Sequence, residues 1–161
     1  MNKLFIGVLA LLASTTAHAG SYLRYGLGVF GSAEYGAASV KYFGLGHEDK
    51  LIGPFIDQYE FGLFADMSGH DRNSSGFGFY SIGVESNPGY FVLRSLFGLG
   101  GITSPDAMLG GMFQFTEDLF LGVRDDRGCM IGIDLKHISS AGLEKPNLGR
   151  DFVVVQVEIP W

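Results

Sequence analysis

The stretch CMIGIDLKHISS, residues 129–140, alternates between two kinds of side chain. Successive side chains of a β-strand point to opposite faces, so residues two apart share a face. One face is apolar until its last two members: Cys129, Ile131, Ile133, Leu135, His137 and Ser139. The other face carries Met130, Gly132, Asp134 and Lys136. The stretch therefore predicts a β-strand with one apolar face and one charged face. The apolar face ends in two polar residues.

The same alternation recurs along most of the chain, between clusters of Gly, Asn, Asp and Pro. It predicts eight strands, at about 21–31, 35–46, 55–67, 75–86, 89–102, 112–124, 128–140 and 151–160. The sixth is the least defined, because 107–124 can hold one bent strand or two. Short turns are expected at 32–33, 87–89 and 125–128, and longer loops at 47–54, 68–74, 103–111 and 141–150. With both chain ends in the periplasm, 47–54 would be a long periplasmic turn.

The composition favours a membrane barrel. Glycine accounts for 25 of 161 residues, aromatic residues for 14%, and charged residues for only 17%, where about 25% is usual. After the first twenty residues no apolar run reaches the roughly 18 residues of a transmembrane helix. We therefore predict an all-β fold, an eight-stranded antiparallel β-barrel of the outer membrane. Charged and polar side chains with inward parity should fill its interior as a polar network and leave no pore: Arg24, Glu60, Asp66, Arg94, Asp134, Lys136, Gln156 and Glu158.

The first nineteen residues, MNKLFIGVLALLASTTAHA, have the features of a secretory signal peptide. Lys3 precedes a short apolar run, and Ala17-His18-Ala19 forms a small-x-small cleavage site. We therefore expect Sec-type export and a barrel domain over 20–161. A soluble exported β-sandwich is the alternative fold. It predicts that Ile131, Ile133, Val155 and Val157 face a protein core.

Several other kinds of site are not favoured. The net charge of −6 argues against a nucleic-acid partner. The segment GLGVFG, 26–31, matches a nucleotide-binding pattern, but its glycines lie within a predicted strand instead of between a strand and a helix. His47-Glu48-Asp49 and His70-Asp71 lack a recognisable metal-ligand spacing. We expect neither a metal nor an organic cofactor.

The polar end of the strand at 129–140 is a candidate active site. His137 and Ser139 share a face, about 7 Å apart at the backbone, which suitable side chains can bridge. Asp151 starts the next strand with the parity of its outward row, so it lies on the same face near the same rim. A histidine between a serine and a carboxylate is the arrangement of a Ser-His-Asp triad. The alternative is that these polar residues only mark the headgroup level of the membrane.

The segment HISSAGLEKPNLGRD, 137–151, resembles the signature of the lipid A 3-O-deacylase (PagL) family. That signature reads His-x-Ser-Asn-Ala, then Pro-Asn-x-Gly, then an acidic residue. The matching positions are His137, Ser139, Ala141, Pro146, Asn147 and Gly149, with Asp151 at the spacing of the acid. The terminal EIPW and the segment FTEDLFLGVR are also similar to that family, so the resemblance covers about the last 50 residues.

The resemblance implies hydrolysis of the ester-linked 3-hydroxyacyl chain at position 3 of lipid A, in the outer leaflet. It assigns Ser139 as nucleophile, His137 as general base and Asp151 as the orienting acid. Two positions depart from the family: Asp151 replaces a glutamate, and Ser140 replaces an asparagine of the oxyanion hole. The backbone N–H of Gly142 matches the second oxyanion donor.

Four residues of the same loop are weaker candidates for substrate contacts: Glu144, Lys145, Pro146 and Asn147. The sequence leaves two further arrangements open. One is a homodimer. The other is a non-catalytic structural or adhesive barrel of the same architecture, which the change at Ser140 would favour.

Overall fold

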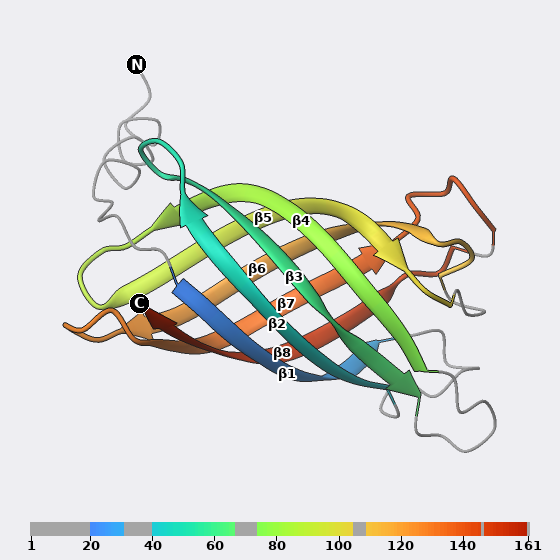
Figure 1. Ribbon diagram of the computed structural model, residues 1–161, viewed down its shortest axis with the longest axis horizontal. Helices are drawn as coiled ribbons and strands as arrows, with labels where there is room; N and C mark the ends of the chain where they lie inside the picture. Colours follow the sequence, from blue (N-terminus) through green and yellow to red (C-terminus); the bar gives the residue numbers. More distant parts are fainter. Residues whose placement is uncertain (1–19, 31–39, 67–73, 105–108, 146, 161) are drawn as a thin grey trace.

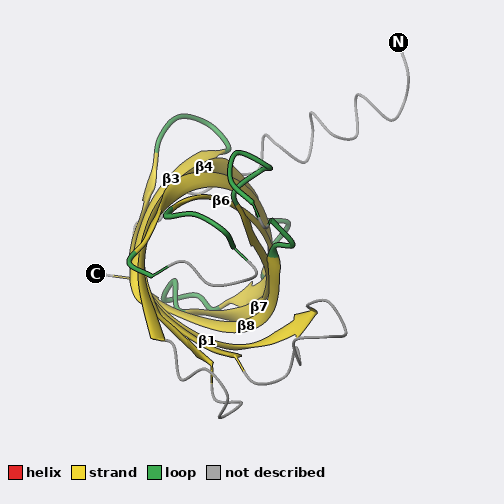
Figure 2. Ribbon diagram, turned by 90° about the vertical axis from the view of Figure 1, so that its right-hand side faces the viewer, coloured by secondary structure: helices red, strands yellow, loops and turns green. Residues whose placement is uncertain are grey.

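The computed structural model describes residues 20–30, 40–66, 74–104, 109–145 and 147–160. Their eight strands are β1 (Gly20–Phe30), β2 (Val40–Lys50), β3 (Phe55–Asp66), β4 (Ser74–Ser86), β5 (Phe91–Ile102), β6 (Phe113–Arg124), β7 (Met130–Ser139) and β8 (Arg150–Pro160). Each strand pairs antiparallel with the next, and β1 pairs with β8, so the sheet closes into a barrel (Figures 1 and 2). The predicted fold is confirmed.

The strand boundaries differ from the prediction mainly in β2. This strand continues to Lys50, with Asp49 opposite Asp57 and Lys50 opposite Ile56. The predicted long turn at 47–54 is therefore wrong, and the connection is only 51–54. The polar run after Gly46 does not end the strand, because its alternate side chains still point inward and outward. The doubtful region 107–124 holds one described strand, β6. The predicted turn at 32–33 and the His70-Asp71 pair lie outside the described residues.

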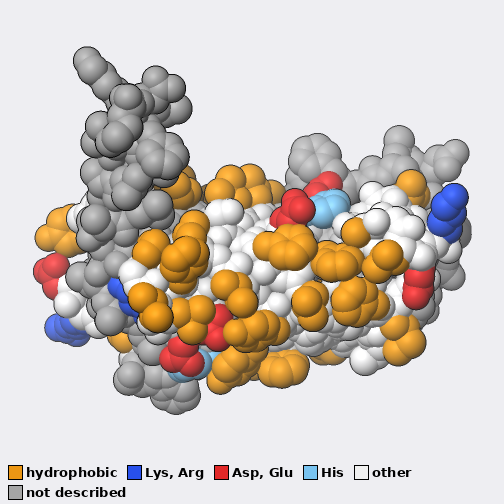
Figure 3. Space-filling view, turned by 90° about the horizontal axis from the view of Figure 1, so that it is seen from above, with side chains coloured by type: hydrophobic (Ala, Val, Ile, Leu, Met, Phe, Trp, Pro, Cys, Tyr) orange, Lys and Arg blue, Asp and Glu red, His pale blue; other side chains and the backbone are white. Residues whose placement is uncertain are grey.

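The apolar face of each strand forms the outer surface of the barrel. In β7 the side chains of Ile131 and Ile133 are 53% and 55% exposed, and in β8 Val155 is 47% exposed. Apolar side chains spread along the length of the outer surface in Figure 3. No helix among the described residues is long and apolar enough to span a membrane. These exposed rows exclude the β-sandwich, which needs the same residues in its core.

A network of buried charges fills the middle of the barrel. Lys136 Nζ lies 2.7 Å from Asp118 Oδ1 and 3.3 Å from Glu60 Oε2, and Arg24 Nη1 donates to the same Glu60 oxygen at 2.7 Å. Nearer the chain ends, Arg94 contacts three glutamates, Glu48, Glu85 and Glu158. The network confirms that the inward charges occupy the lumen. Asp66, also predicted there, has a side chain outside the description.

An apolar cluster fills the other half of the interior, toward the loops at the far end from the chain ends. Its members are Tyr42, Phe64, Phe77, Phe79, Ile102, Leu109, Ile138, Phe152 and Val154. Leu109 comes from the β5–β6 connection and is fully buried, so this loop helps to close the end of the barrel far from the chain ends. Ile138 lies between His137 and Ser139 in the chain, and Phe152 follows Asp151. The cluster therefore anchors from inside the strand ends that carry the candidate triad outside.

Candidate active site

His137 and Asp151 lie directly opposite each other on β7 and β8. The Nδ1–H of His137 donates to Asp151 Oδ1 at 2.7 Å, with side chains 38% and 48% exposed on the outer face. A carboxylate that accepts from Nδ1 leaves the lone pair of the imidazole on Nε2. The cross-strand register brings the carboxylate within reach although aspartate is one methylene shorter than glutamate.

Ser139 lies two residues beyond His137 on the same strand and the same outer face. No hydrogen bond joins its hydroxyl to His137 in the part of the chain that the structure describes. Catalytic hydrogen bonds are often long before substrate binds, so Ser139 Oγ and His137 Nε2 must approach each other for proton transfer. The structure thus brings the three predicted residues to one rim of the outer surface, as their parity indicated.

The loop after Ser139 opens with a tight turn. Leu143 N–H donates to Ser140 O at 3.0 Å, and the two residues between them, Ala141 and Gly142, have φ of 51° and 79°. Two consecutive positive φ values define a type I′ turn. Glycine adopts this conformation freely, whereas in alanine it costs of order 1–3 kcal/mol. The strained alanine thus lies two residues after the predicted nucleophile.

Ser140 is built into this loop. It is fully buried, its N–H donates to Asn147 Oδ1 at 2.8 Å, and its hydroxyl donates to Glu144 O at 3.1 Å. In this conformation the hydroxyl bridges the loop and does not face the outer surface. Use of this hydroxyl as an oxyanion donor would require that bond to break. The amide of Asn147, whose oxygen is fixed by Ser140, keeps its Nδ2 donors for other partners.

The remaining predicted residues lie around the turn. Gly142 is exposed, and Asn147 is partly exposed. Glu144 and Lys145 are exposed, and the Glu144 carboxylate lies against Gly111 of the β5–β6 connection. Pro146 lies outside the described residues. No group of three or more His, Cys, Asp or Glu side chains able to hold a metal ion gathers among the residues with described positions.

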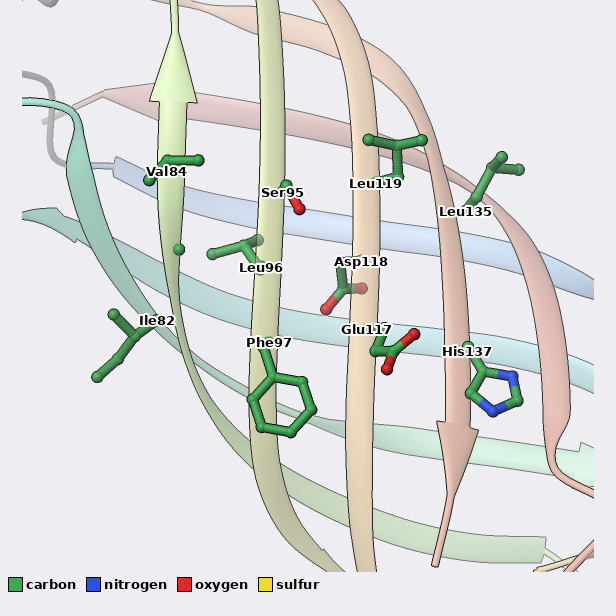
Figure 4. Close-up of a pocket in the computed structure, with 11 residues that line it drawn as sticks. Ile82, Val84, Ser95, Leu96, Phe97, Glu117, Asp118, Leu119, Leu135 and His137 are labelled. Atoms are coloured by element: carbon green, nitrogen blue, oxygen red, sulfur yellow. The ribbon is translucent and has the colours of Figure 1, made fainter. Parts of the chain in front are cut away.

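A second carboxylate, Glu117 on β6, was missed by the sequence reasoning. Its register partner on β7 is His137, so the imidazole lies between Glu117 on one side and Asp151 on the other. Figure 4 shows the Glu117 carboxylate and the His137 ring next to each other on adjacent strands. The signal was present in FTEDLFLGVR, where Glu117 is the one charged residue in an otherwise apolar outward row. A charge placed toward lipid is costly, which favours a functional role.

An open depression on the outer surface begins at these two residues. It has a volume of about 620 Å³ and extends from His137 and Glu117 across β6, β5 and β4. Its floor and walls are mainly apolar, and Ile82, Phe97, Leu119 and Leu135 contribute side chains to it (Figure 4). An imidazole oriented by a carboxylate, beside a serine and an apolar depression, is suited to acyl transfer on a lipid ester.

Comparisons with known proteins agree with this geometry. A family model described as "Lipid A 3-O-deacylase (PagL)" matches residues 35–160. No curated protein matches the chain. Among solved structures the chain is similar to one titled "Crystal structure of the outer membrane enzyme PagL", with a TM-score of 0.67 and 16% sequence identity. That alignment covers 89% of this chain and 99% of the other, so the whole barrel is shared.

Proposed function

Because this chain belongs to the lipid A 3-O-deacylase (PagL) family, we propose that it hydrolyses the 3-O-acyl ester of lipid A with Ser139, His137 and Asp151. The protein is an outer-membrane β-barrel and a carboxylic ester hydrolase, and lipid A in the membrane is its substrate. The observation that supports the triad most directly is the 2.7 Å hydrogen bond between His137 Nδ1 and Asp151 Oδ1, made on the lipid-facing surface.

The reaction begins when His137 Nε2 takes the proton from the Ser139 hydroxyl. The serine oxygen attacks the ester carbonyl, and the carbonyl π pair moves onto its oxygen. Collapse of this intermediate breaks the bond to the sugar oxygen, which receives the proton from the imidazolium. Water, deprotonated by His137, then attacks the acyl-serine and releases the 3-hydroxy fatty acid. Asp151 and the neighbouring Glu117 both place negative charge beside the imidazolium that forms.

The oxyanion requires donors close to Ser139. The backbone N–H of Gly142 is the first candidate, because Gly142 is exposed in the type I′ turn, three residues after the nucleophile. For the second donor, the sequence pointed to Ser140. The bond from its hydroxyl to Glu144 O favours instead the Nδ2 of Asn147, which Ser140 N–H fixes through Oδ1. Removal of one such donor costs on the order of 10²–10³ in kcat.

The substrate can stay in the membrane throughout. The triad faces outward at the loop end of the barrel, the end that faces the cell exterior when both chain ends are periplasmic. The apolar depression beside His137 offers the cleaved acyl chain a lipid-side path along β6 and β5. All three triad residues come from one chain, so the proposal does not depend on a homodimer.

The experiment that tests the triad is covalent labelling of the purified, folded barrel. A fluorophosphonate forms an oxygen–phosphorus bond with an activated serine and releases fluoride. We expect one label, on Ser139, in the wild type, and none in Ser139→Ala or His137→Ala. Labelling that persists in a folded His137→Ala variant at the wild-type rate would contradict the proposed base.

A further inference from the structure

Gly149 lies beside the imidazole of His137. It is buried, with φ of +72°, directly before β8 begins. A Cβ built at this position would lie 2.6 Å from His137 Cε1, 3.2 Å from His137 Nε2 and 3.4 Å from the carbonyl oxygen of Ile138. Contacts below 3.0 Å do not occur between real atoms of this kind, so a side chain at 149 must displace the ring or the backbone.

The ring has little freedom to give way. Its Nδ1 is held by Asp151 at 2.7 Å, and Asp151 is only two residues from Gly149. A shift of the 149–151 backbone would move the carboxylate, and a shift of the ring would stretch the same hydrogen bond. Either movement changes the direction of Nε2.

The register shows which space would be lost. His137 pairs with Asp151 and Ile138 with Arg150, where the ladder ends, and Gly149 directly precedes Arg150 on the side of Ser139. The missing side chain therefore leaves open the volume beside Nε2, where the hydroxyl of Ser139 must come to give up its proton. Resting on the function proposed above, we infer that Gly149 is a positioning residue, whose lack of a side chain keeps the imidazole aligned with Ser139.

The test compares Gly149→Ala with Gly89→Ala. Gly89, in the β4–β5 turn, has φ of +75° but no atom within 4 Å of a built Cβ, so it carries the same backbone strain without the contact. For Gly149→Ala we expect a loss of kcat of about 100-fold, the effect of a displacement near 1 Å, with KM within about twofold. For Gly89→Ala we expect the wild-type kcat.

A second readout is independent of turnover. In ¹⁵N-histidine-labelled protein, Gly149→Ala should shift both ring-nitrogen resonances of His137, and Gly89→Ala should leave them unchanged. If Gly149→Ala does not fold, Gly149→Asn replaces it, because asparagine tolerates positive φ but still carries a Cβ. A folded Gly149→Asn or Gly149→Ala barrel with wild-type kcat, or with unshifted His137 resonances, overturns the inference. Shifted resonances in a protein whose wild type hydrolyses no lipid A would instead contradict the proposed function.

Discussion

At the scale of single residues, the site depends on cross-strand distance more than on side-chain identity. The family's acid is a glutamate, yet Asp151 reaches the imidazole at 2.7 Å because it is the direct register partner of His137. Parity therefore placed the three candidate residues on one face, and the family resemblance assigned their proposed roles. Parity could not predict that a side chain at 149 would collide with the ring, or that Ser140 bonds to Glu144, because both depend on how the 140–149 loop folds back.

The acid provides the first prediction. Asp151→Asn keeps the size of the side chain but no longer favours the tautomer with its proton on Nδ1, so kcat should fall by about 10⁴. Asp151→Glu, the matched control, should stay within about tenfold of the wild type. Release of 3-hydroxy fatty acid from lipid A in mixed micelles measures both. Wild-type turnover in a folded Asp151→Asn barrel would remove Asp151 from the triad.

The second prediction concerns the oxyanion hole. Asn147→Asp keeps an oxygen for Ser140 N–H but replaces the Nδ2 donor, so kcat should fall about 10²–10³-fold. Ser140→Ala removes only the hydroxyl that bridges to Glu144, and we expect a loss below tenfold in the folded fraction. The same fatty-acid assay, corrected for folded protein by gel migration, distinguishes them. A larger loss of kcat in Ser140→Ala than in Asn147→Asp would indicate that Ser140 is the oxyanion donor.

At the scale of the strands, β7 has an apolar outer face that ends in the candidate active site and an inner face whose charges join the buried network. Alternation predicted both, and the interior charges are paired where they were expected. The alternation could not fix where β2 ends, because polar residues at a barrel rim keep the period but lose the apolar signal. It marked Glu117 as a charge in an apolar outward row, but only the register between β6 and β7 shows that this carboxylate lies opposite His137.

The ion pairs inside the barrel give a prediction at this scale. Lys136 is fully buried against Asp118 and Glu60. Lys136→Met leaves these carboxylates without that cation and should lower the free energy of unfolding by about 3–5 kcal/mol. Lys145→Met, at an exposed loop position, is the control and should change it little. Urea titration in lipid vesicles measures the difference, and an unchanged midpoint for a folded Lys136→Met would contradict the network's role.

At the scale of the whole molecule, the barrel is inverted relative to a soluble protein. Its network of ion pairs lies inside and its apolar rows lie outside, so the bilayer acts as the apolar solvent that a soluble core would otherwise provide. This arrangement explains how a small chain with one cysteine forms a stable fold. It also places an esterase where the ester of its lipid substrate already resides.

This inversion predicts the effect of a charge on the outer wall. Ile133 lies near the middle of β7 and is more than half exposed to the membrane side. Ile133→Arg should reduce stability in vesicles by roughly 2–4 kcal/mol, the cost of an arginine near the bilayer midplane. Asp126→Arg, in the β6–β7 turn outside the membrane, should change little. Equal unfolding midpoints for Ile133→Arg and wild type would show that this face does not contact lipid.

In the proposed reaction, Ser139 removes the 3-O-acyl chain of lipid A. The most direct measurement is mass spectrometry of lipid A extracted from cells that express either the wild type or Ser139→Ala, both verified as folded by their heat-modifiable migration. We expect lipid A to lose the mass of one 3-hydroxyacyl chain with the wild type only. Intact lipid A with the folded wild type, or the same loss with Ser139→Ala, would contradict the proposed function of Ser139.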